Sequence, residues 1–420
     1  MAISIVVSTW VARDAGWEAL LRQTELRLTS ERETKKHQIE EAFDLYKKQI
    51  ITSSRNSMTI NAASSLSASF KNYKNDIGAN ADIAKMKTIL LNYYQSQFGA
   101  EYTRRNDQSP PDPNSIINNL SDNAITLQHN LIAANKHPLG QKQNLDKPND
   151  AAAYSDEHNR YHPSYRSFVE YFGYYDLFIV DPVSGNIVYS VFKEMDYATS
   201  LINGPYANSG IGKAFKTANA STDPDFVAVE DFDVYIPSYN APVAFMASPI
   251  FQDSVKIGIL ILQLPVEKIN AITTSKQSWQ QSGLGESGET YLVGADSKMR
   301  SVSRFFIESP EEYLNAAKAN GLDDENANLI VKRGTTASLQ SIQSEAFKKA
   351  IAGESGFIES IDYRGVPVLS AYAKLDILGL DWVILSEMDV AEAQLPSTRL
   401  SDALLMSSAV VASILAFLAI

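Results

Sequence analysis

The first 135 residues carry the hydrophobic spacing of α-helices. Over residues 14–73 the apolar positions recur at intervals of four, three and four, and charged residues fill the positions between them. The apolar residues that set this spacing are Ile39, Phe43, Tyr46 and Ile50. The pattern predicts one long helix. Helical spacing continues over residues 81–134, although the prolines within residues 107–114 predict a loop there, and residues 137–156 are also expected to be a loop.

After Phe172 the pattern changes to short runs rich in Tyr, Phe, Val and Ile, which are typical of β-strands. DLFIVD and NIVYSVF, joined by a turn at residues 182–185, predict a hairpin. Three more strands are predicted by FVAVEDF, VAFMASPIF and KIGILILQL. The last run is apolar on both faces, which predicts a central strand. Residues 197–217 are expected to form a short helix and a loop.

A second set of elements follows in the same order. ETYLVGADSKMRSVS predicts strand, turn and strand, residues 310–351 predict helix, and SGFIESI, VPVLSAYAKL and DWVILSEM predict strands. Asp181 and Asp296, which lie in the two hairpin turns, are 115 residues apart. The repeated order predicts an α+β fold with long N-terminal helices followed by two tandem antiparallel-sheet modules.

Both ends of the chain are apolar. Residues 403–420 contain 18 uncharged residues, which at about 1.5 Å each would reach about 27 Å, close to a hydrocarbon core of roughly 30 Å. A membrane helix is therefore expected over residues 401–420, where the chain stops inside the span; the alternative is a buried C-terminal helix. Residues 1–12 are too short to span alone and are expected to be the remnant of a first membrane helix.

Composition removes several classes of function. The 420 residues carry a net charge of −12 and no Lys/Arg-rich run, which argues against a nucleic-acid-binding surface. Without cysteine, the chain has neither disulfides nor thiolate metal sites nor cysteine nucleophiles. No Ser/His/Asp order or paired-carboxylate motif is identifiable, so we expect no catalytic residues and no enzymatic activity in this chain.

Two motifs suggest chemistry but lack its context. Residues 283–288 match G-x-G-x-x-G, yet a strand follows this motif where a dinucleotide site requires a helix, so a flexible loop is expected. His158 and His162 are four residues apart, a spacing that places two imidazoles on one helix face and would suit zinc. No third histidine follows nearby. A polar packing role is the alternative, and we expect neither a metal nor a cofactor.

Three longer stretches resemble one bacterial subgroup of double Cache sensor domains. They are YHPSYRSFVEYFGYYDLFIVD (161–181), NIVYSVFKEMDYATSLINGPY (186–206) and WQQSGLGESGETYLVGADSKMRSVSRF (279–305). The resemblance implies two PAS-like modules outside the cytoplasm, joined to a chemoreceptor, receptor cyclase or histidine kinase output. It also implies a homodimer in the bacterial inner membrane, with a periplasmic body whose membrane-distal module binds a small molecule.

On this basis the chain is divided into five parts. Residues 13–150 form a helical stalk and helical region, residues 151–275 the distal module and residues 276–395 the proximal module, between the expected membrane segments 1–12 and 401–420. In the proximal module, Met299, Arg300, Ser301 and Arg304 are expected to hold the module together.

One departure from the family pattern concerns the ligand. Amino-acid-binding members carry an Arg-x-Trp-Tyr element whose arginine holds the ligand carboxylate, and an acidic residue that takes the amine. Here the corresponding stretch reads Asn203-Gly204-Pro205-Tyr206, and no arginine occurs within residues 167–299. The carboxylate clamp is missing, whereas an acidic position survives as Asp231 or Asp233.

The composition of the distal module favours a cationic ligand. Residues 167–270 contain 12 acidic residues and 5 lysines, and nine tyrosines lie within residues 165–239. Tyrosines and carboxylates that face one cavity suit an ammonium ion or another cation. The candidate ligand-binding residues are Tyr175, Tyr189, Asp196, Tyr206, Asp231, Asp233, Tyr235 and Tyr239. Asp231 or Asp233 would take a ligand amine, and the tyrosines would wall the pocket.

The leading hypothesis is therefore the ligand-sensing region of a transmembrane receptor, which binds a small molecule and passes a conformational change through the membrane. The alternative is a ligand-free module for dimerisation or partner sensing, which a pocket filled by its own side chains would favour. A third hypothesis is a metal sensor that uses His158 and His162.

Overall fold

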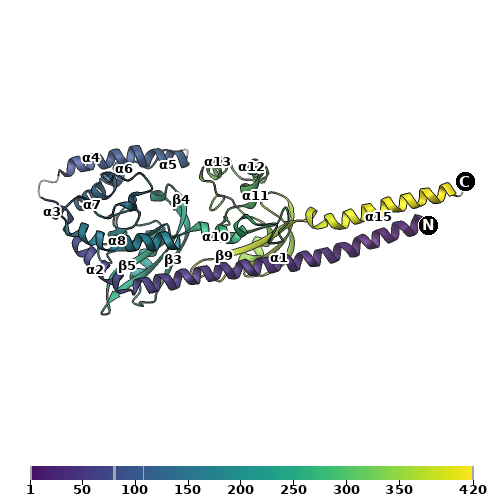
Figure 1. Cartoon of the computed structure of the whole chain (residues 1–420), viewed down its shortest axis with the longest axis horizontal. Helices are drawn as coiled ribbons and strands as arrows, with labels where there is room; N and C mark the ends of the chain where they lie inside the picture. Colours follow the sequence, from purple (N-terminus) through teal and green to yellow (C-terminus); the bar gives the residue numbers. More distant parts are fainter. Residues whose placement is uncertain (1, 79–81, 107, 419–420) are drawn as a thin grey trace.

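The computed structural model describes the backbone of residues 2–78, 82–106 and 108–418, and side chains from residue 14 to residue 414 with a few gaps (Figure 1). Its first helix, α1 (Ala2–Ser54), runs along the length of the molecule. α2 (Ser57–Phe70) follows after a break. The break arises at Asn56, whose extended backbone lets its side chain accept a hydrogen bond from the Met58 N–H and cap α2. The predicted single helix is thus two helices.

α1 packs against both sheets of the molecule. The four apolar residues whose spacing predicted the helix, Ile39, Phe43, Tyr46 and Ile50, are all buried, which confirms the prediction. Arg32 donates hydrogen bonds to the carbonyls of Gly356 and Tyr372 in the second sheet. The hydroxyl of Ser54 lies 3.3 Å from that of Ser248 in the first sheet. One rigid element therefore touches both sheets.

A helical region connects α2 to the first sheet. Its elements are α3 (Tyr73–Asp76), α4 (Ile83–Tyr93), η1 (Tyr94–Phe98), α5 (Gly99–Asn106), α6 (Pro113–Ile117), α7 (Asp122–Gln128), η2 (His129–Ala133), η3 (Lys142–Asn144) and α8 (Ala153–Phe172). η1 and η2 are π-helices, which are rare and occur frequently at functional sites. The loop expected over residues 107–114 ends at Asp112, whose side chain caps α6. Residue 107, the first of this loop, lies outside the described residues.

The first sheet is antiparallel and has the strand order β2-β1-β5-β4-β3. Its strands are β1 (Asp176–Val180), β2 (Ile187–Ser190), β3 (Ala228–Tyr235), β4 (Ala241–Gln252) and β5 (Val255–Leu264). The predicted hairpin is confirmed by the pairing of β1 with β2, and β5 is the central strand, as predicted. α1 and α2 pack on one face, and α9 (Gly210–Ala220) packs on the other, where Gly210 approaches the ring of Phe245. α10 (Val266–Thr273) leads to the second sheet.

The second sheet is also antiparallel and has the order β6-β9-β8-β7. Its strands are β6 (Glu289–Gly294), β7 (Gly356–Ile361), β8 (Pro367–Lys374) and β9 (Trp382–Asp389), and its helices are α11 (Arg304–Glu308), α12 (Pro310–Ala319), α13 (Asp324–Arg333) and α14 (Glu345–Ile351). The second strand predicted after β6 is wrong. Met299 makes one isolated bridge to Val293, and its backbone N–H donates to the Gln340 carbonyl, so residues 298–300 lie beside β6 without forming a regular strand.

We call the first sheet with α8 to α10 (residues 153–273) the first module, and the second sheet with α11 to α14 (residues 289–389) the second module. α15 (Val390–Leu418) leaves the second module and runs beside the N-terminal part of α1, so that the two chain ends lie at the same end of the molecule (Figure 1).

Within the described residues, no helix combines the length and the apolar character that crossing a membrane requires. The segments expected to enter the membrane, 1–12 and 401–420, fall in part on residues whose side chains are outside the described set. Membrane helices at the two ends therefore stay a prediction.

Candidate ligand site in the first module

A group of acidic side chains is buried on the face of the first sheet that lies away from α1. Asp176 opens β1, and its carboxylate accepts hydrogen bonds from the backbone N–H groups of Val191 and Phe192 at 2.8 and 3.2 Å. These bonds fix the segment that follows β2. The same segment carries Glu194 and Asp196, which therefore come close to Asp176 and to each other.

Asp196 is fully buried and only half of its carboxylate is hydrogen bonded. Its Oδ2 accepts from the Tyr235 hydroxyl at 2.5 Å, whereas Oδ1 has no partner among the described residues. Burial raises the pKa of Asp196 to about 6. The Tyr206 hydroxyl, also buried, likewise has no partner there, and its ring meets that of Tyr235 edge to face at 5.8 Å. Buried polar atoms without partners are rare and call for a ligand, a water or an ion.

Acidic side chains outnumber basic ones around Asp196. Glu194 is half-buried, accepts a hydrogen bond from the Ser238 hydroxyl at 3.3 Å, and has its pKa raised by burial and by Asp196 and Asp176. Lys193 is the buried lysine of this segment, and burial lowers its pKa to about 7. Its ammonium group donates to the carbonyls of Ser190 and Val191 and not to a carboxylate. A bound cation would stabilise the ionised acids.

A small cavity of about 30 Å³ adjoins this group. Its charged lining residues are Lys142, Lys193 and Glu194, and aromatic residues also line it: Tyr93, Tyr94, Phe98, Phe192 and Tyr239. Tyr239 stacks on Phe98 with ring centroids 5.0 Å apart. Asp196 and Tyr206 lie beside the cavity, close enough to Tyr94 for their charges to raise its pKa further than burial alone. The cavity has room for about one water molecule, so the site is closed in this structure.

The backbone around the cavity is irregular on both sides. Both π-helices contribute to the lining, η1 through Tyr94 and Phe98 and η2 through Ile132. Lys193 and Tyr239 have left-handed backbones with φ of 57° and 58°. Left-handed conformations are costly for residues other than glycine, and they cluster at ligand sites and switch regions.

The structure brings together half of the residues predicted from the sequence. Asp196, Tyr206 and Tyr235 form one buried cluster, and Tyr239 lines the adjoining cavity. Tyr175 lies elsewhere, at the cleft between the modules, where its hydroxyl donates to Glu267.

The two aspartates predicted to take the ligand amine do not lie at the cavity. Asp231 accepts two hydrogen bonds from the guanidinium of Arg300, at 3.0 and 2.9 Å, and one from the indole of Trp382 at 3.0 Å. Asp233 is exposed to solvent. Arg300 was expected to act within its own module, but it joins the second module to β3 of the first.

Tyr189 belongs to a separate cluster around His158 and His162. The two imidazoles stack at 4.4 Å, and His162 lies 2.7 Å from the Tyr189 hydroxyl through Nδ1 and 2.6 Å from the Gln143 carbonyl through Nε2. Burial lowers the pKa of both histidines, to about 2 for His162. Both ring nitrogens of His162 and Nδ1 of His158 thus have hydrogen-bond partners within the protein. The part of the chain that the structure describes contains no group of three or more potential metal ligands.

The glycine-rich loop at residues 283–288 binds a carboxylate of the chain itself. The backbone N–H groups of Glu286 and Ser287 donate to Glu392 at 2.9 and 2.7 Å. Glu392 lies in the first turn of α15, so the loop fastens the start of this helix to the second module. A side chain at Gly285 would collide with Glu392.

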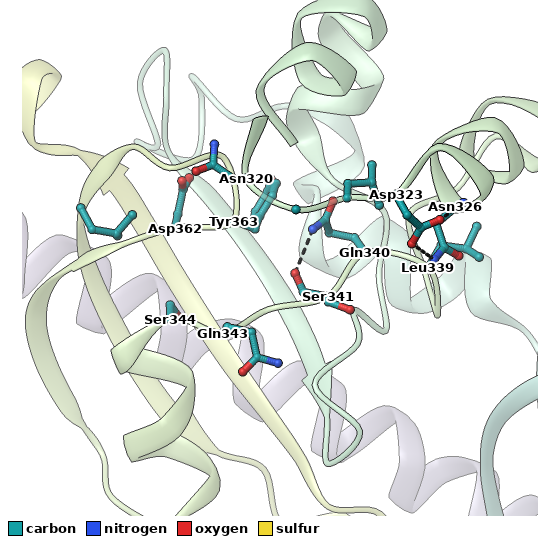
Figure 2. Close-up of a pocket in the computed structure, with 13 residues that line it drawn as sticks. Asn320, Asp323, Asn326, Leu339, Gln340, Ser341, Gln343, Ser344, Asp362 and Tyr363 are labelled. Carbon is teal, nitrogen blue, oxygen red and sulfur yellow. Dashed lines mark hydrogen bonds between the residues drawn. The ribbon is translucent and has the colours of Figure 1, made fainter. Parts of the chain in front are cut away.

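The second module contains a larger cavity of about 340 Å³ (Figure 2). Figure 2 shows Asn320 and Asp362 on one side of this cavity and Asp323 and Asn326 on the other. Its main polar groups are bonded within the protein. Asp323 accepts from Asn326, Asp362 accepts from Arg364, and the Gln340 amide donates to the Ser341 carbonyl at 2.8 Å.

No protein-family model and no curated protein matches the chain. Solved structures that are similar to it include the ligand-binding domain of the amino acid chemoreceptor PctC of Pseudomonas aeruginosa PAO1 in complex with GABA (14% identity, 70% of this chain and 98% of that chain, TM-score 0.33). Another is the ligand-binding domain of the Pseudomonas fluorescens chemoreceptor CtaA in complex with L-alanine (11%, 73% and 95%, TM-score 0.30). A third is the extracellular domain of the putative histidine kinase vpHK1S-Z8 (14%, 77% and 98%, TM-score 0.34).

Proposed function

We propose that this chain is the ligand-sensing region of a bacterial transmembrane receptor, and that its first module binds a small cationic molecule, most simply an amine. The observation that carries the proposal is a pair of buried oxygens without a partner among the described residues, Asp196 Oδ1 and Tyr206 Oη, next to the segment that lines a small cavity. No catalytic activity is proposed for the chain.

The chemistry of the cluster fits an ammonium group. Asp196 has a pKa of about 6, so its carboxylate is largely ionised at neutral pH and its Oδ1 would accept a charge-assisted hydrogen bond. Tyr206 would accept a second bond through its oxygen. Glu194 would be ionised by the same cation, because a nearby positive charge lowers the pKa of a carboxyl group. The rings of Tyr94, Tyr235 and Tyr239 would add cation–π attraction.

Binding requires the aromatic cover of the cavity to move. Phe98 belongs to a π-helix and Tyr239 to a left-handed turn, so both stand on backbone that is not in its lowest-energy conformation. Opening of the stacked pair would join the cavity to the unpartnered oxygens of Asp196 and Tyr206. A ligand changes the receptor only through its different affinities for the closed and open states.

The route from the site to the chain ends is short. β3 holds Tyr235 of the cluster and also Asp231, which is bonded to Arg300 and Trp382 of the second module. The second module in turn holds the start of α15 through Glu392. We propose that α1 and α15 carry the change to the bacterial inner membrane, with the modules in the periplasm and two copies forming a homodimer.

A second candidate function is a ligand-free module for dimerisation or partner sensing. One observation favours it: side chains of the chain itself fill the first-module site and leave a cavity of about 30 Å³.

A thermal-shift screen separates the two functions. The purified chain is heated in the presence of primary amines, polyamines, quaternary ammonium compounds, carboxylates and divalent metals. A ligand at 100 times its Kd stabilises the folded state by about 2.7 kcal/mol, which raises the melting temperature measurably. Shifts confined to cations support the proposal. Shifts with carboxylates alone contradict the cationic site, and no shift in any class favours the ligand-free module.

A further inference from the structure

A cleft of about 490 Å³ lies between the two modules and is distinct from the amine site proposed above. α5 and the end of α13 both contribute to its lining, and these two helices contact each other. Its lining includes five charged side chains and the hydroxyl-bearing ring of a tyrosine: Arg104, Arg105, Tyr175, Glu267, Lys332 and Arg333.

The cleft is basic although the chain is acidic. Its lining carries four cationic residues and one acidic residue, a formal charge of 4 − 1 = +3. Glu101, which forms ion pairs with Arg104 and Arg105, reduces this to +2. The chain as a whole carries −12, whereas the lining of this cleft is positive. Clefts lined by one sign of charge attract small ions of the opposite sign.

Arg333 is the strongest indication that an anion binds here. It has no acidic partner among the described residues, and burial lowers the pKa of its guanidinium. Its Nη2 donates to the Asn106 side chain at 2.5 Å, while its Nε is buried without a partner. A buried guanidinium nitrogen without an acceptor is costly, and an oxyanion in the cleft would supply one.

Arg105 of α5 offers a second group in the lining. Its Nε donates to Glu101 at 2.7 Å, and its guanidinium lies over the ring of Tyr239 at 4.7 Å. Within the described part of the chain, its two Nη atoms make no hydrogen bond. The stacking on Tyr239 holds the guanidinium plane in place, which favours bidentate binding of a planar or tetrahedral oxyanion.

We infer that this cleft binds a small multivalent oxyanion, a phosphate or a polycarboxylate, between Arg105 of α5 and Arg333 of α13. Arg105 belongs to the helical region and Arg333 to the second module, so the anion would add a further link between these two parts. Tyr239 lines both this cleft and the small cavity of the first module, and the anion would therefore also affect the cover of the amine site.

Isothermal titration calorimetry of the purified chain with inorganic phosphate and with citrate tests the inference. We expect one of these anions to bind once per chain, and Arg333→Gln to weaken it at least about tenfold, the loss expected for a charge-assisted hydrogen bond. The matched control is Arg160→Gln, which removes one positive charge from an exposed position on α8. It should leave the affinity unchanged.

Three results would overturn the inference: neither anion binds, Arg333→Gln binds as tightly as the wild type, or Arg160→Gln weakens binding as much as Arg333→Gln. Should Arg333→Gln melt at a lower temperature than the wild type, Arg105→Gln serves in its place with the same expected loss. Asp196→Asn should retain the anion, so failure of the amine site and failure of the anion cleft are distinguishable.

Discussion

Both modules bury carboxylates on the side of the sheet that lies away from α1. The two groups differ in how completely their oxygens are hydrogen bonded. In the second module, Glu289 and Glu387 are paired across β6 and β9. Both oxygens of Glu289 accept hydrogen bonds, from the Arg304 N–H and the Tyr363 hydroxyl, each at 2.6 Å. Both oxygens of Glu387 also accept, from Ser370 and Tyr291, each at 2.8 Å. These acids are satisfied by the protein alone.

In the first module the corresponding group is incomplete. Asp176 is fully bonded, but Asp196 has one free oxygen among the described residues, and the hydroxyl of Tyr206 beside it is also free. The larger cavity lies in the second module, yet none of its described lining residues has a buried polar atom without a partner. Among these buried carboxylates, only that of Asp196 has an oxygen without a partner among the described residues, and this difference supports the ligand site proposed in the first module.

The largest effect is expected from a matched pair of substitutions, one in each module. Asp196→Asn should weaken amine binding at least about a hundredfold, because it removes the charge that an ammonium group would contact. Glu387→Gln should leave binding unchanged. Thermal-shift titration of both variants with the amines that stabilise the wild type measures the difference. Equal losses in the two variants would contradict the distinction between the modules.

The link between the modules should affect stability more than binding. Asp231→Ala leaves the buried Arg300 without one of its carboxylates and should lower the free energy of unfolding by about 2 kcal/mol. This is less than for a fully buried pair, because the Asp231 side chain is 33% exposed. Asp233→Ala, at an exposed position, should change it by less than about 0.5 kcal/mol. Urea unfolding measures both free energies. If the Asp231→Ala chain is as stable as the wild type but no longer binds amines, Asp231 belongs to the ligand site after all.

The two buried acids should also differ in their effect on pH dependence. Burial raises the pKa of Asp196 from 3.8 to about 6 and that of Glu387 from 4.5 to about 8. The folded state then holds a proton that the unfolded state has lost, so the free energy of unfolding falls as pH rises across each interval, by at most about 1.4 kcal/mol per pH unit.

Glu387→Gln should therefore remove part of the slope up to about pH 8, whereas Asp196→Asn should remove it only up to about pH 6. Urea unfolding of the wild type and both variants between pH 4 and pH 9 measures the slopes. A change of slope between pH 6 and pH 8 in Asp196→Asn alone would reverse the assignment.

The smallest effect is expected at Tyr206. Tyr206→Phe removes the second unpartnered oxygen and should weaken amine binding about fivefold, the value of one hydrogen bond of about 1 kcal/mol. The stability of the free chain should stay the same or rise slightly, because a buried group without a partner is removed. Tyr291→Phe in the second module is the control; it breaks a bond to Glu387 and should lower stability without affecting binding.

Much of the fold follows from local pattern. The burial of Ile39 and Phe43, the hairpin of β1 and β2 and the central place of β5 were all predicted from spacing and composition. The strand predicted after β6 failed because Met299 pairs with residues near Gln340, a contact between segments that no local pattern encodes.

The candidate site was only half predictable for the same reason. Asp196, Tyr206 and Tyr235 lie within the stretch whose excess of acids and tyrosines drew attention to it. Asp231 lies there too, but its partner Arg300 is 69 residues away and takes it out of the site.

The cover of the cavity comes from η1, about a hundred residues before Asp196 in the chain. The one sequence signal for it was the aromatic spacing of Tyr94, Phe98 and Tyr102, which is equally typical of an ordinary helix core.

A crystal structure of the chain with the amine that produces the largest thermal shift tests the central claim most directly. The account predicts the ligand nitrogen within about 3 Å of Asp196 Oδ1 and of the Tyr206 hydroxyl, with Phe98 and Tyr239 displaced from their stacked positions. An amine bound in the second-module cavity, or in the cleft between the modules with Asp196 Oδ1 still unpartnered, would contradict it.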